Sequence, residues 1–415
     1  MDTQHADISI IIPVWNNWEM TKACLHSLHQ HTHGVTYHVI LVDNASTDDT
    51  SREAPALGTS LFGESFTYLS LPENLGFAKA CNQGAWASKS KYLFFLNNDT
   101  TVTPGWLPPL VSAMHEDKRL AGVGPLLLFP EDGSVRAGRV QHLGITISHG
   151  PEFRHLYELF PPSHPAVQKR RKLNVITAAA LLIPAALFKA EKGFHERFVN
   201  GMEDVDLCCR VTRRGGYFSV IPDSVIHHHT GCTAGRFDRE ADNLRLLLQR
   251  CRDMHEDINA LVVEDGFELD FTPWLDSIVK LPDASAAQLK QQYQDNPTQE
   301  HLNSLLTTEP LWDEGYVLLV NQALIDGDLG KATITAYLRS LLCPSLAAYQ
   351  NYIHLMKGCD NPDLIKKNET MLTAIENAIA DRQGLAKKAQ DIMKSTRNSA
   401  TLEALKKTMA KSSAD

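Results

Sequence analysis

The sequence predicts an α/β fold followed by an all-helical region, and three observations support this. In the first 100 residues, short apolar and β-branched runs typical of buried parallel strands alternate with stretches at helical spacing. Beyond about residue 280 these runs disappear, and Gln, Lys, Asp, Ala and Leu recur at helical spacing. A length of 415 residues exceeds one ordinary core, so we expect two domains, at 1–265 and 280–415.

The composition is that of a globular protein, with 43% hydrophobic and 21% charged residues. A net charge of -9 argues against nucleic acid as a partner, because phosphate binding requires a basic face. We expect a cytoplasmic location, since no run reaches the roughly 18 to 20 apolar residues of a membrane span and no signal-peptide pattern is visible. The eight cysteines form no CxxC pair, which favours free thiols over a zinc site or a disulfide framework.

Four strands are predicted in the N-terminal part, and three of them end in polar residues. The predicted strands are 8–14, 37–42, 66–71 and 91–96, with helical stretches at 18–32 and within 74–88. Asn16, Asp43 and the run 97–99 follow the first, second and fourth strands. Because ligands bind at the carboxyl edge of an open α/β sheet, we expect these side chains to share one crevice.

The middle of the chain is less regular. Residues 125–172 contain prolines, glycines, several histidines and the basic run 169–172, and we expect loops and short edge strands there. We interpret the basic run as a solvated face, with phosphate binding as the alternative. An apolar stretch at 174–183 predicts another strand. Residues 201–206 are expected to open a helix that runs through 207–214 and is ended by two glycines.

The C-terminal region carries one pattern of a helical repeat. Residues 327–332 and Pro344 resemble the second helix and closing proline of a tetratricopeptide repeat, and Trp312, Gly315 and Tyr316 lie where its first helix would carry them. Only one repeat is readable, which predicts paired antiparallel helices. We also expect the Lys- and Ala-rich tail, 370–411, to be helical.

Several groups at the strand ends suit a nucleotide and a divalent cation. Pro13 and Trp15 lie at the end of the first predicted strand, and Asp43 lies at the end of the second. A carboxylate there can accept the imide N–H of uracil or thymine. Asp99 can bind Mg²⁺ or Mn²⁺ that bridges phosphates, because hard divalent ions complete their shells with phosphate and water oxygens. These acids can equally be turn or cap residues.

Two further clusters are candidates for proton transfer and for a second metal ligand. Glu203 and Asp204, at the start of a helix, are candidate general bases, although they can also complement the helix dipole. The histidines at 227–229 offer imidazole, which suits Mn²⁺, or form an exposed strand end. The functional interpretation therefore depends on the order and spacing of all the groups together.

Taken together, these motifs resemble those of the family-two glycosyltransferases of GT-A fold, particularly the rhamnosyltransferase-like members. The resemblance covers residues 7 to about 235, more than half of the chain. The matching stretches are 9–17, 42–48, 74–78, 82–84, 96–100 and 203–207, followed by 225–231. A GT-A domain is Rossmann-like with a mainly parallel sheet, so the resemblance agrees with the predicted class.

The resemblance implies an inverting glycosyltransferase that moves a sugar from a UDP- or dTDP-sugar, dTDP-rhamnose among them, to an acceptor hydroxyl on a saccharide, a lipid-linked glycan or a protein. Such enzymes build bacterial cell-surface polysaccharides. It implies Asp204 as general base, with Glu203 as the first substitute. The cofactor is Mn²⁺ or Mg²⁺, held by Asp99 and by His228 or His227. The implied nucleotide and donor contacts are Pro13, Trp15, Asn16, Asp43, Asn74, Lys79, Asn82, Asn97 and Asn98.

Three positions depart from the family pattern. Asn97 replaces an acid, Ala178 replaces a glycine, and His195 replaces an aspartate. In the family, the positions of Ala178 and His195 lie on the donor-sugar and acceptor side, so the resemblance does not determine the identity of the sugar. Registering Thr233 against the family's closing serine favours His228 as the metal ligand, whereas registering Val225 favours His227. Alternative functions are a sugar-phosphate nucleotidyltransferase and an inactive GT-A scaffold. A peripheral membrane contact, and a protein partner or dimer contact through the C-terminal helices, also stay open.

Overall fold

The computed structural model describes residues 6–149, 152–229, 239–252, 254–358 and 361–412. The chain divides into two compact units, one of residues 1–146 with 155–254 and one of residues 147–154 with 255–415. The domain bounds expected from the sequence, 1–265 and 280–415, stay a prediction about independently folding parts.

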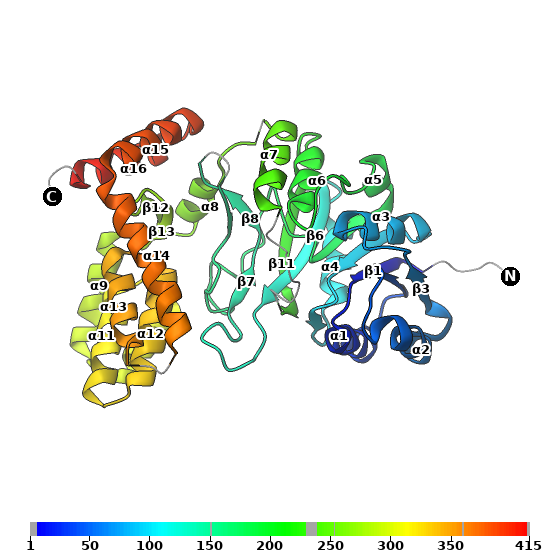
Figure 1. The fold of residues 1–415 in the computed structure, drawn as a ribbon, viewed down its shortest axis with the longest axis horizontal. Helices are drawn as coiled ribbons and strands as arrows, with labels where there is room; N and C mark the ends of the chain where they lie inside the picture. Colours follow the sequence, from blue (N-terminus) through cyan, green and yellow to red (C-terminus); the bar gives the residue numbers. More distant parts are fainter. Residues whose placement is uncertain (1–5, 150–151, 230–238, 253, 359–360, 413–415) are drawn as a thin grey trace. The chain divides into compact units, whose positions relative to one another are not determined.

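The first unit is built on a mixed sheet of nine strands in the order β3-β2-β1-β4-β10-β6-β11-β5, with β7 paired to β6 (Figure 1). Its parallel N-terminal half consists of β1 (Ile8–Val14), β2 (Tyr37–Asp43), β3 (Phe66–Ser70) and β4 (Tyr92–Leu96). The other half consists of β5 (Thr100–Val102), β6 (Leu120–Leu128), β7 (Val140–His142), β10 (Ala180–Pro184) and β11 (Tyr217–His228). A separate small sheet pairs β8 (Ile145–Ile147) with β9 (Phe153–His155).

Helices cover both faces of this sheet, which is why β1 is buried along its whole length. The helices of the first unit are α1 (Trp18–His31), α2 (Thr50–Phe62), α3 (Phe77–Ala87), α4 (Leu107–Glu116), α5 (Ala185–Ala190), α6 (Glu203–Thr212) and α7 (Glu240–Arg250), with a short 3-10 turn at Gly63–Ser65. Ile10 packs in the core with α1 and α4, whereas Ile11 faces α3. A Cβ on Gly84 of α3 would lie 2.5 Å from Ile11, so only glycine permits this close approach.

The second unit is mainly helical. It contains α8 (Ile258–Glu264), the antiparallel hairpin of β12 (Glu268–Phe271) and β13 (Ser277–Lys280), and eight further helices. These are α9 (Asp283–Asp295), α10 (Gln299–Thr308), α11 (Asp313–Ile325), α12 (Leu329–Leu342), α13 (Leu346–Met356), α14 (Pro362–Ala380), α15 (Arg382–Ser395) and α16 (Ser399–Ser412). Among the described residues, no helix is long and apolar enough to cross a membrane.

The α/β class with a Rossmann-like, mainly parallel sheet followed by helices is confirmed, and the four N-terminal strands lie within one residue of their predicted ends. The paired helices predicted around residue 327 are α11 and α12, which lie side by side (Figure 1). Gly327 joins them with φ 75, and Asp328 caps α12 by accepting a hydrogen bond from the Lys331 N–H over 2.8 Å. The hairpin before residue 280 was not predicted.

Two predictions in the middle of the chain are wrong in part. The strand expected at 174–183 begins only at Ala180. Conversely, residues 125–128, the start of the segment expected to hold loops and short edge strands, belong to β6, a fully buried strand inside the sheet. The short strands β7, β8 and β9 in the same segment agree with the prediction. The glycines of β6 look like turn signals, but a Cβ on Gly122 would lie 2.9 Å from the Leu182 carbonyl oxygen of β10, and one on Gly124 would lie 2.9 Å from that of Ala180. These glycines therefore allow close packing of the two strands.

The prediction that the basic run 169–172 is a solvated face holds only in part, whereas the prediction of free thiols holds for the cysteines described. Arg171 is buried, donates hydrogen bonds to the carbonyls of Ala166 and Lys169, and lies over the Tyr157 ring, so the run is not simply a solvated face. The prediction of free thiols is confirmed for the six cysteines whose state is described, Cys24, Cys81, Cys208, Cys209, Cys251 and Cys343.

Candidate active site

A pocket of about 610 Å³ lies in the first unit at the carboxyl edge of the sheet. The predicted site residues that line it are Pro13, Trp15, Asn74, Asn97, Asn98, Asp99, Glu203, Asp204 and His228. The predicted residues that do not line it are Asn16, Asp43, Lys79, Asn82 and His227. The strand ends therefore meet at one crevice, as the parallel arrangement predicts.

Asp99 and His228 lie side by side in the pocket. The Oδ1 atom of Asp99 lies 3.2 Å from Nε2 of His228, and both side chains are largely buried. The antiparallel pairing of β5 with β11 sets this distance, because it places His228 opposite Thr100, the residue after Asp99. The His229 N–H also donates to the Asp99 carbonyl over 2.8 Å.

Asn97 completes a set of donors that fits a divalent cation. Its Nδ2 lies 3.4 Å from Nε2 of His228, and its Oδ1 is buried with no hydrogen-bond partner. A buried amide oxygen without a partner is costly, and a cation at this point would satisfy it. The carboxylate of Asp99, the imidazole of His228 and this oxygen suit Mn²⁺ or Mg²⁺. Within the described ranges, no group of three or more His, Cys, Asp or Glu side chains is arranged to hold a metal.

His227 points away from this cluster. Successive side chains of a strand lie on opposite faces of the sheet, and the His227 ring lies with Nδ1 3.2 Å from the Phe129 carbonyl oxygen. Of the two histidines left open by the sequence, His228 therefore lies beside Asp99 and His227 does not. Thr233, on which one of the registers depended, is outside the described residues.

Asp204 lies in the first turn of α6, directed into the pocket. Its Oδ2 accepts a hydrogen bond from the Ala178 N–H over 3.0 Å, and its Oδ1 accepts one from the Val205 N–H over 2.8 Å. These two backbone donors fix the orientation of the carboxylate. Glu203 is more deeply buried, and its Oε2 accepts from the Gly201 N–H over 2.8 Å. Asp204 is thus the better placed of the two acids to meet a ligand.

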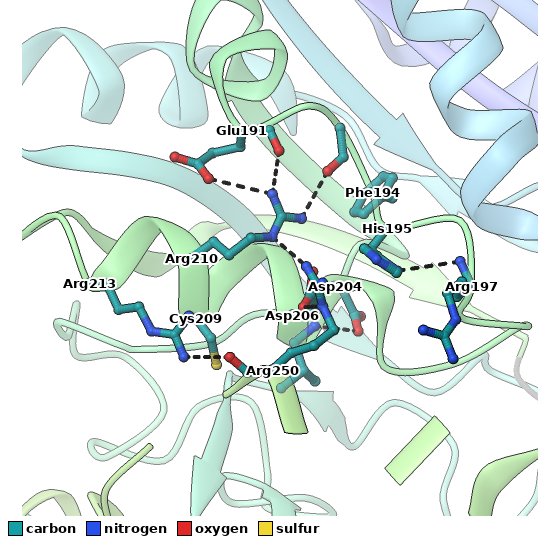
Figure 2. Close-up of polar contacts among 12 residues, drawn as sticks. Glu191, Phe194, His195, Arg197, Asp204, Asp206, Cys209, Arg210, Arg213 and Arg250 are labelled. Carbon is teal, nitrogen blue, oxygen red and sulfur yellow. Dashed lines mark hydrogen bonds and ion pairs between the residues drawn. The ribbon is translucent and has the colours of Figure 1, made fainter. Parts of the chain in front are cut away.

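A buried ion-pair cluster supports the helix that carries Asp204 (Figure 2). Asp206 is fully buried and accepts hydrogen bonds from Nε of Arg210 over 2.9 Å and from Nε of Arg250 over 2.5 Å. Arg210 also donates to the carbonyl oxygens of Glu191 and Gly193. The cluster therefore ties α6 to α7 and to the turn after α5, which fixes the start of α6.

His195, one of the departures from the family pattern, lies in the same region (Figure 2). Burial lowers the pKa of His195 below its usual 6.5, and the nearby Arg250 acts in the same direction. The ring does not line the pocket. Its Nδ1 instead accepts a hydrogen bond from the Arg197 N–H at 3.4 Å, within the loop before α6.

On the β1 and β2 side of the pocket, Trp15 and Asn74 are joined by Asn44, which the sequence analysis did not single out. Asn44 Nδ2 donates to Asn74 Oδ1 over 2.8 Å, and Asn44 Oδ1 accepts from the Leu75 N–H over 2.7 Å. The signal was present, since Asn44 directly follows a strand. Trp15 is 38% exposed, as a ring offered to a ligand would be.

Asp43 and Asn16 hold the loop behind this wall. Asp43 is 1% exposed, and its carboxylate accepts hydrogen bonds from the Ser46 N–H over 2.9 Å and the Tyr68 hydroxyl over 2.5 Å. Asn16, at φ 57, accepts from the Thr47 N–H over 2.7 Å. Both side chains therefore position the 43–48 loop, and neither lines the pocket.

Asn82 and Lys79 lie on α3, away from the pocket wall. The amide of Asn82 exchanges two 2.9 Å hydrogen bonds with the backbone of Phe194, and its Nδ2 also lies 3.1 Å from Oε1 of Glu196. This buried amide fastens the loop before α6 to α3. The donor contact implied for it by the resemblance has no support in this geometry.

Four further residues that line the pocket were not predicted individually: Gln141, His142, His155 and Glu158. His142 is buried, and burial holds its pKa well below 6.5, with His155 and His228 acting in the same direction. Glu158 lies between Tyr157 and Leu159, which both have positive φ, 52 and 69. Such backbone at a pocket wall is typical of functional loops. The histidines in this irregular segment were the only signal in the sequence.

The family model described as glycosyl transferase family 2 matches residues 9–172. The chain therefore contains a family 2 glycosyltransferase domain. The matched range covers β1 to β9 and includes Asp99, whereas the two other main groups of the pocket, Asp204 and His228, lie beyond it. The GT-A architecture expected of this family agrees with the sheet of the first unit.

Known relatives of the domain include proteins of polysaccharide biosynthesis. The O-antigen biosynthesis protein RfbC of Myxococcus xanthus is 29% identical over 243 residues, which cover 57% of this chain and 18% of that protein. The N-acetylglucosaminyl-diphospho-decaprenol L-rhamnosyltransferase of Mycobacterium tuberculosis is 28% identical over 221 residues, 48% of this chain and 68% of that enzyme. The chain thus spans less than a fifth of the length of the Myxococcus relative.

Among solved structures, the mannosyltransferase PcManGT from Pyrobaculum calidifontis in complex with GDP-Man and Mn²⁺ superposes with a TM-score of 0.47. The two sequences are 17% identical, and the superposition covers 85% of this chain and 88% of that one.

Proposed function

We propose that this protein is an inverting glycosyltransferase that moves a sugar from a nucleoside diphosphate sugar to an acceptor hydroxyl with the help of Mn²⁺ or Mg²⁺. The observation that carries the proposal is the placement of two kinds of group in one pocket. Asp99, Asn97 and His228 offer a cation site, and Asp204 offers a fixed carboxylate.

The donor would lie with its base and ribose against the β1 and β2 wall, near Trp15 and the Asn44–Asn74 pair. Its diphosphate would then lie toward Asp99 and His228. A divalent cation bound there supplies the positive charge that stabilises the departing diphosphate. Asp43 stays our candidate for reading the base, and it would act through the 43–48 loop that it holds.

Asp204 would act as the general base. The acceptor oxygen forms a bond to the anomeric carbon on the face opposite the diphosphate, and the bond from that carbon to the diphosphate oxygen breaks. The acceptor proton passes to a carboxylate oxygen of Asp204. The N–H groups of Ala178 and Val205 hold this carboxylate in one direction, which limits the reorganisation that the reaction requires.

The finer identity of the substrates is also a proposal. The Mycobacterium relative is named for rhamnosyl transfer to a lipid-diphosphate-linked sugar, which supports dTDP-rhamnose as donor and a lipid-linked saccharide as acceptor. The Myxococcus relative supports a role in a cell-surface polysaccharide. A cytoplasmic location, peripheral to the membrane that carries such an acceptor, belongs to the same proposal.

A transfer assay with UDP- and dTDP-sugars, with and without Mn²⁺, tests this function. We expect metal-dependent release of the nucleoside diphosphate and a product with inverted anomeric configuration. Retention of configuration would overturn the single displacement. Synthesis of a nucleotide sugar from a nucleoside triphosphate and a sugar phosphate would instead favour a nucleotidyltransferase.

A further inference from the structure

Gln141 is bonded at both ends of its side-chain amide to a single residue, His228. Its Oε1 lies 2.7 Å from Nδ1 of the His228 ring, and its Nε2 donates over 2.7 Å to the His228 backbone carbonyl. Gln141 is only 4% exposed, so water cannot replace these bonds easily. The amide therefore fixes the ring relative to its own backbone.

This arrangement determines the tautomer of His228. A backbone carbonyl can only accept a hydrogen bond, so the NH₂ end of the Gln141 amide must face it. The Oε1 end then faces the ring and can only accept, which places a proton on Nδ1. In the neutral ring, Nε2 consequently carries a lone pair, and it is directed at Asp99 and Asn97.

The backbone of β7 is irregular at the point where this amide is needed. In the pairing of β7 with β6, His142 lies opposite Leu127 and Val140 lies opposite Leu128, so Gln141 is the extra residue of a bulge. A bulge re-aims a side chain, and bulges are frequent beside active sites. The Gln141 carbonyl also lies 3.0 Å from Nδ1 of His155, on the same pocket wall.

We propose that Gln141 is a positioning residue for the cation site: it holds the His228 ring in the tautomer and direction that present the Nε2 lone pair to a divalent cation. The inference rests on the proposed function, because it assumes a cation beside Asp99. Metal-ligating histidines are generally held in this way through their other nitrogen, and loss of such a partner typically weakens metal binding about 10- to 100-fold.

A merely structural role, in which Gln141 joins β7 to β11, makes a different prediction. Removing a structural hydrogen bond lowers the melting temperature of the metal-free protein and leaves the affinity of the folded protein for Mn²⁺ unchanged. The two roles therefore separate when cation affinity and metal-free stability are measured on the same variant.

The test compares Gln141→Met with the matched control Gln168→Met, which removes an exposed glutamine of the same unit that does not line the pocket. Calorimetric titration of each full-length protein with Mn²⁺, in the presence of UDP or dTDP, gives the dissociation constant. We expect it to rise about 10- to 100-fold in Gln141→Met and to stay at the wild-type value in Gln168→Met. An unchanged value in Gln141→Met overturns the inference alone, whereas no Mn²⁺ binding by the wild type overturns the proposed cation site with it.

If Gln141→Met does not fold, the wild-type protein still provides a test. With ¹⁵N-labelled histidine and saturating Mg²⁺ and nucleotide, the resonances of His228 are identified by their loss in His228→Asn. We expect a proton on Nδ1 and none on Nε2. A proton on Nε2 under these conditions overturns the inference.

Discussion

The backbone N–H of Ala178 donates a hydrogen bond to Oδ2 of Asp204, across 26 residues of sequence and over 3.0 Å. Ala178 stands where the related enzymes commonly have a glycine, yet this bond uses only the main chain. The substitution therefore leaves the orientation of the acid intact and adds one methyl group to the pocket wall. We expect any effect of Ala178 on specificity to come from this methyl group at the pocket wall.

Replacing Asp204 by Asn should abolish transfer and leave donor binding nearly intact. The amide cannot take the acceptor proton, and loss of a general base typically costs roughly 10²- to 10⁴-fold in turnover. The measurement is kcat for transfer beside the calorimetric Kd for the nucleoside diphosphate.

Glu203→Gln is the matched control, because Glu203 is the neighbouring acid and is already bonded to the Gly201 N–H. We expect its turnover to stay within a few-fold of wild type. If Glu203→Gln is inactive while Asp204→Asn turns over normally, Glu203 is the base.

Nucleotide binding should require a divalent cation and Asp99. The diphosphate brings several negative charges next to a buried carboxylate, so without a cation the two repel each other. We expect UDP or dTDP to bind the wild type tightly with Mn²⁺ and weakly in EDTA. In Asp99→Asn the difference between the two conditions should largely disappear. Equal wild-type affinity in EDTA would contradict the metal-dependent interpretation.

Asp43 and Tyr68 provide a test of base recognition. Burial, and then the adjacent Asp43 carboxylate, raises the pKa of the Tyr68 hydroxyl, so it stays protonated and donates to Asp43. Tyr68→Phe removes that donor. It should alter nucleotide affinity only if Asp43 contacts the base itself or positions the part of the pocket wall that contacts the base. We expect Asp43→Asn to weaken binding of both UDP and dTDP. Unchanged affinity in both variants would limit Asp43 to holding its loop.

His38 predicts how stability depends on pH in a part of the sheet remote from the pocket. Its Nε2 lies 2.8 Å from Thr67 Oγ1, and burial lowers its pKa below 6.5. Because the unfolded chain then binds a proton more readily than the folded protein, this residue lowers stability as pH falls through the unfolded value of 6.5. Between about pH 7.5 and 5.5, the melting temperature should therefore fall less in His38→Gln than in the wild type. His33→Gln, at an exposed position, is the control.

The features that could be predicted from the sequence are those that depend on a local residue pattern. The strand β1 is an unbroken apolar run, and Asp99 and Asp204 lie at a strand end and a helix start, so both their elements and their common crevice could be inferred. Asn82 could not be placed in the same way, because its partner Phe194 is 112 residues away and nothing local distinguishes a buried amide from a ligand contact. Gln141 was not predicted because the direction of its side chain depends on a bulge, and the bulge arises from the pairing of β7 with β6.

The last prediction concerns the C-terminal helices. In the second unit, the Glu256 carboxylate accepts hydrogen bonds from the hydroxyls of Thr396 and Thr401, which are both buried. Glu256→Ala leaves two buried hydroxyls without this acceptor, at a cost of about 1–3 kcal/mol each. We expect a lower melting temperature, with Glu403→Ala, at an exposed position of α16, as the control.

This variant also tests whether the C-terminal helices serve an acceptor or a partner and not the chemistry. Truncation near residue 275 is a poor test, because it would cut between the two strands of the β12–β13 hairpin, against which α16 packs. Glu256→Ala loosens α15 and α16 within a full-length chain. If these helices are separate from the chemistry, the variant hydrolyses donor at the wild-type rate below its melting temperature, and a loss is confined to transfer. A loss of donor hydrolysis by the folded variant would assign the C-terminal helices a part in the active site.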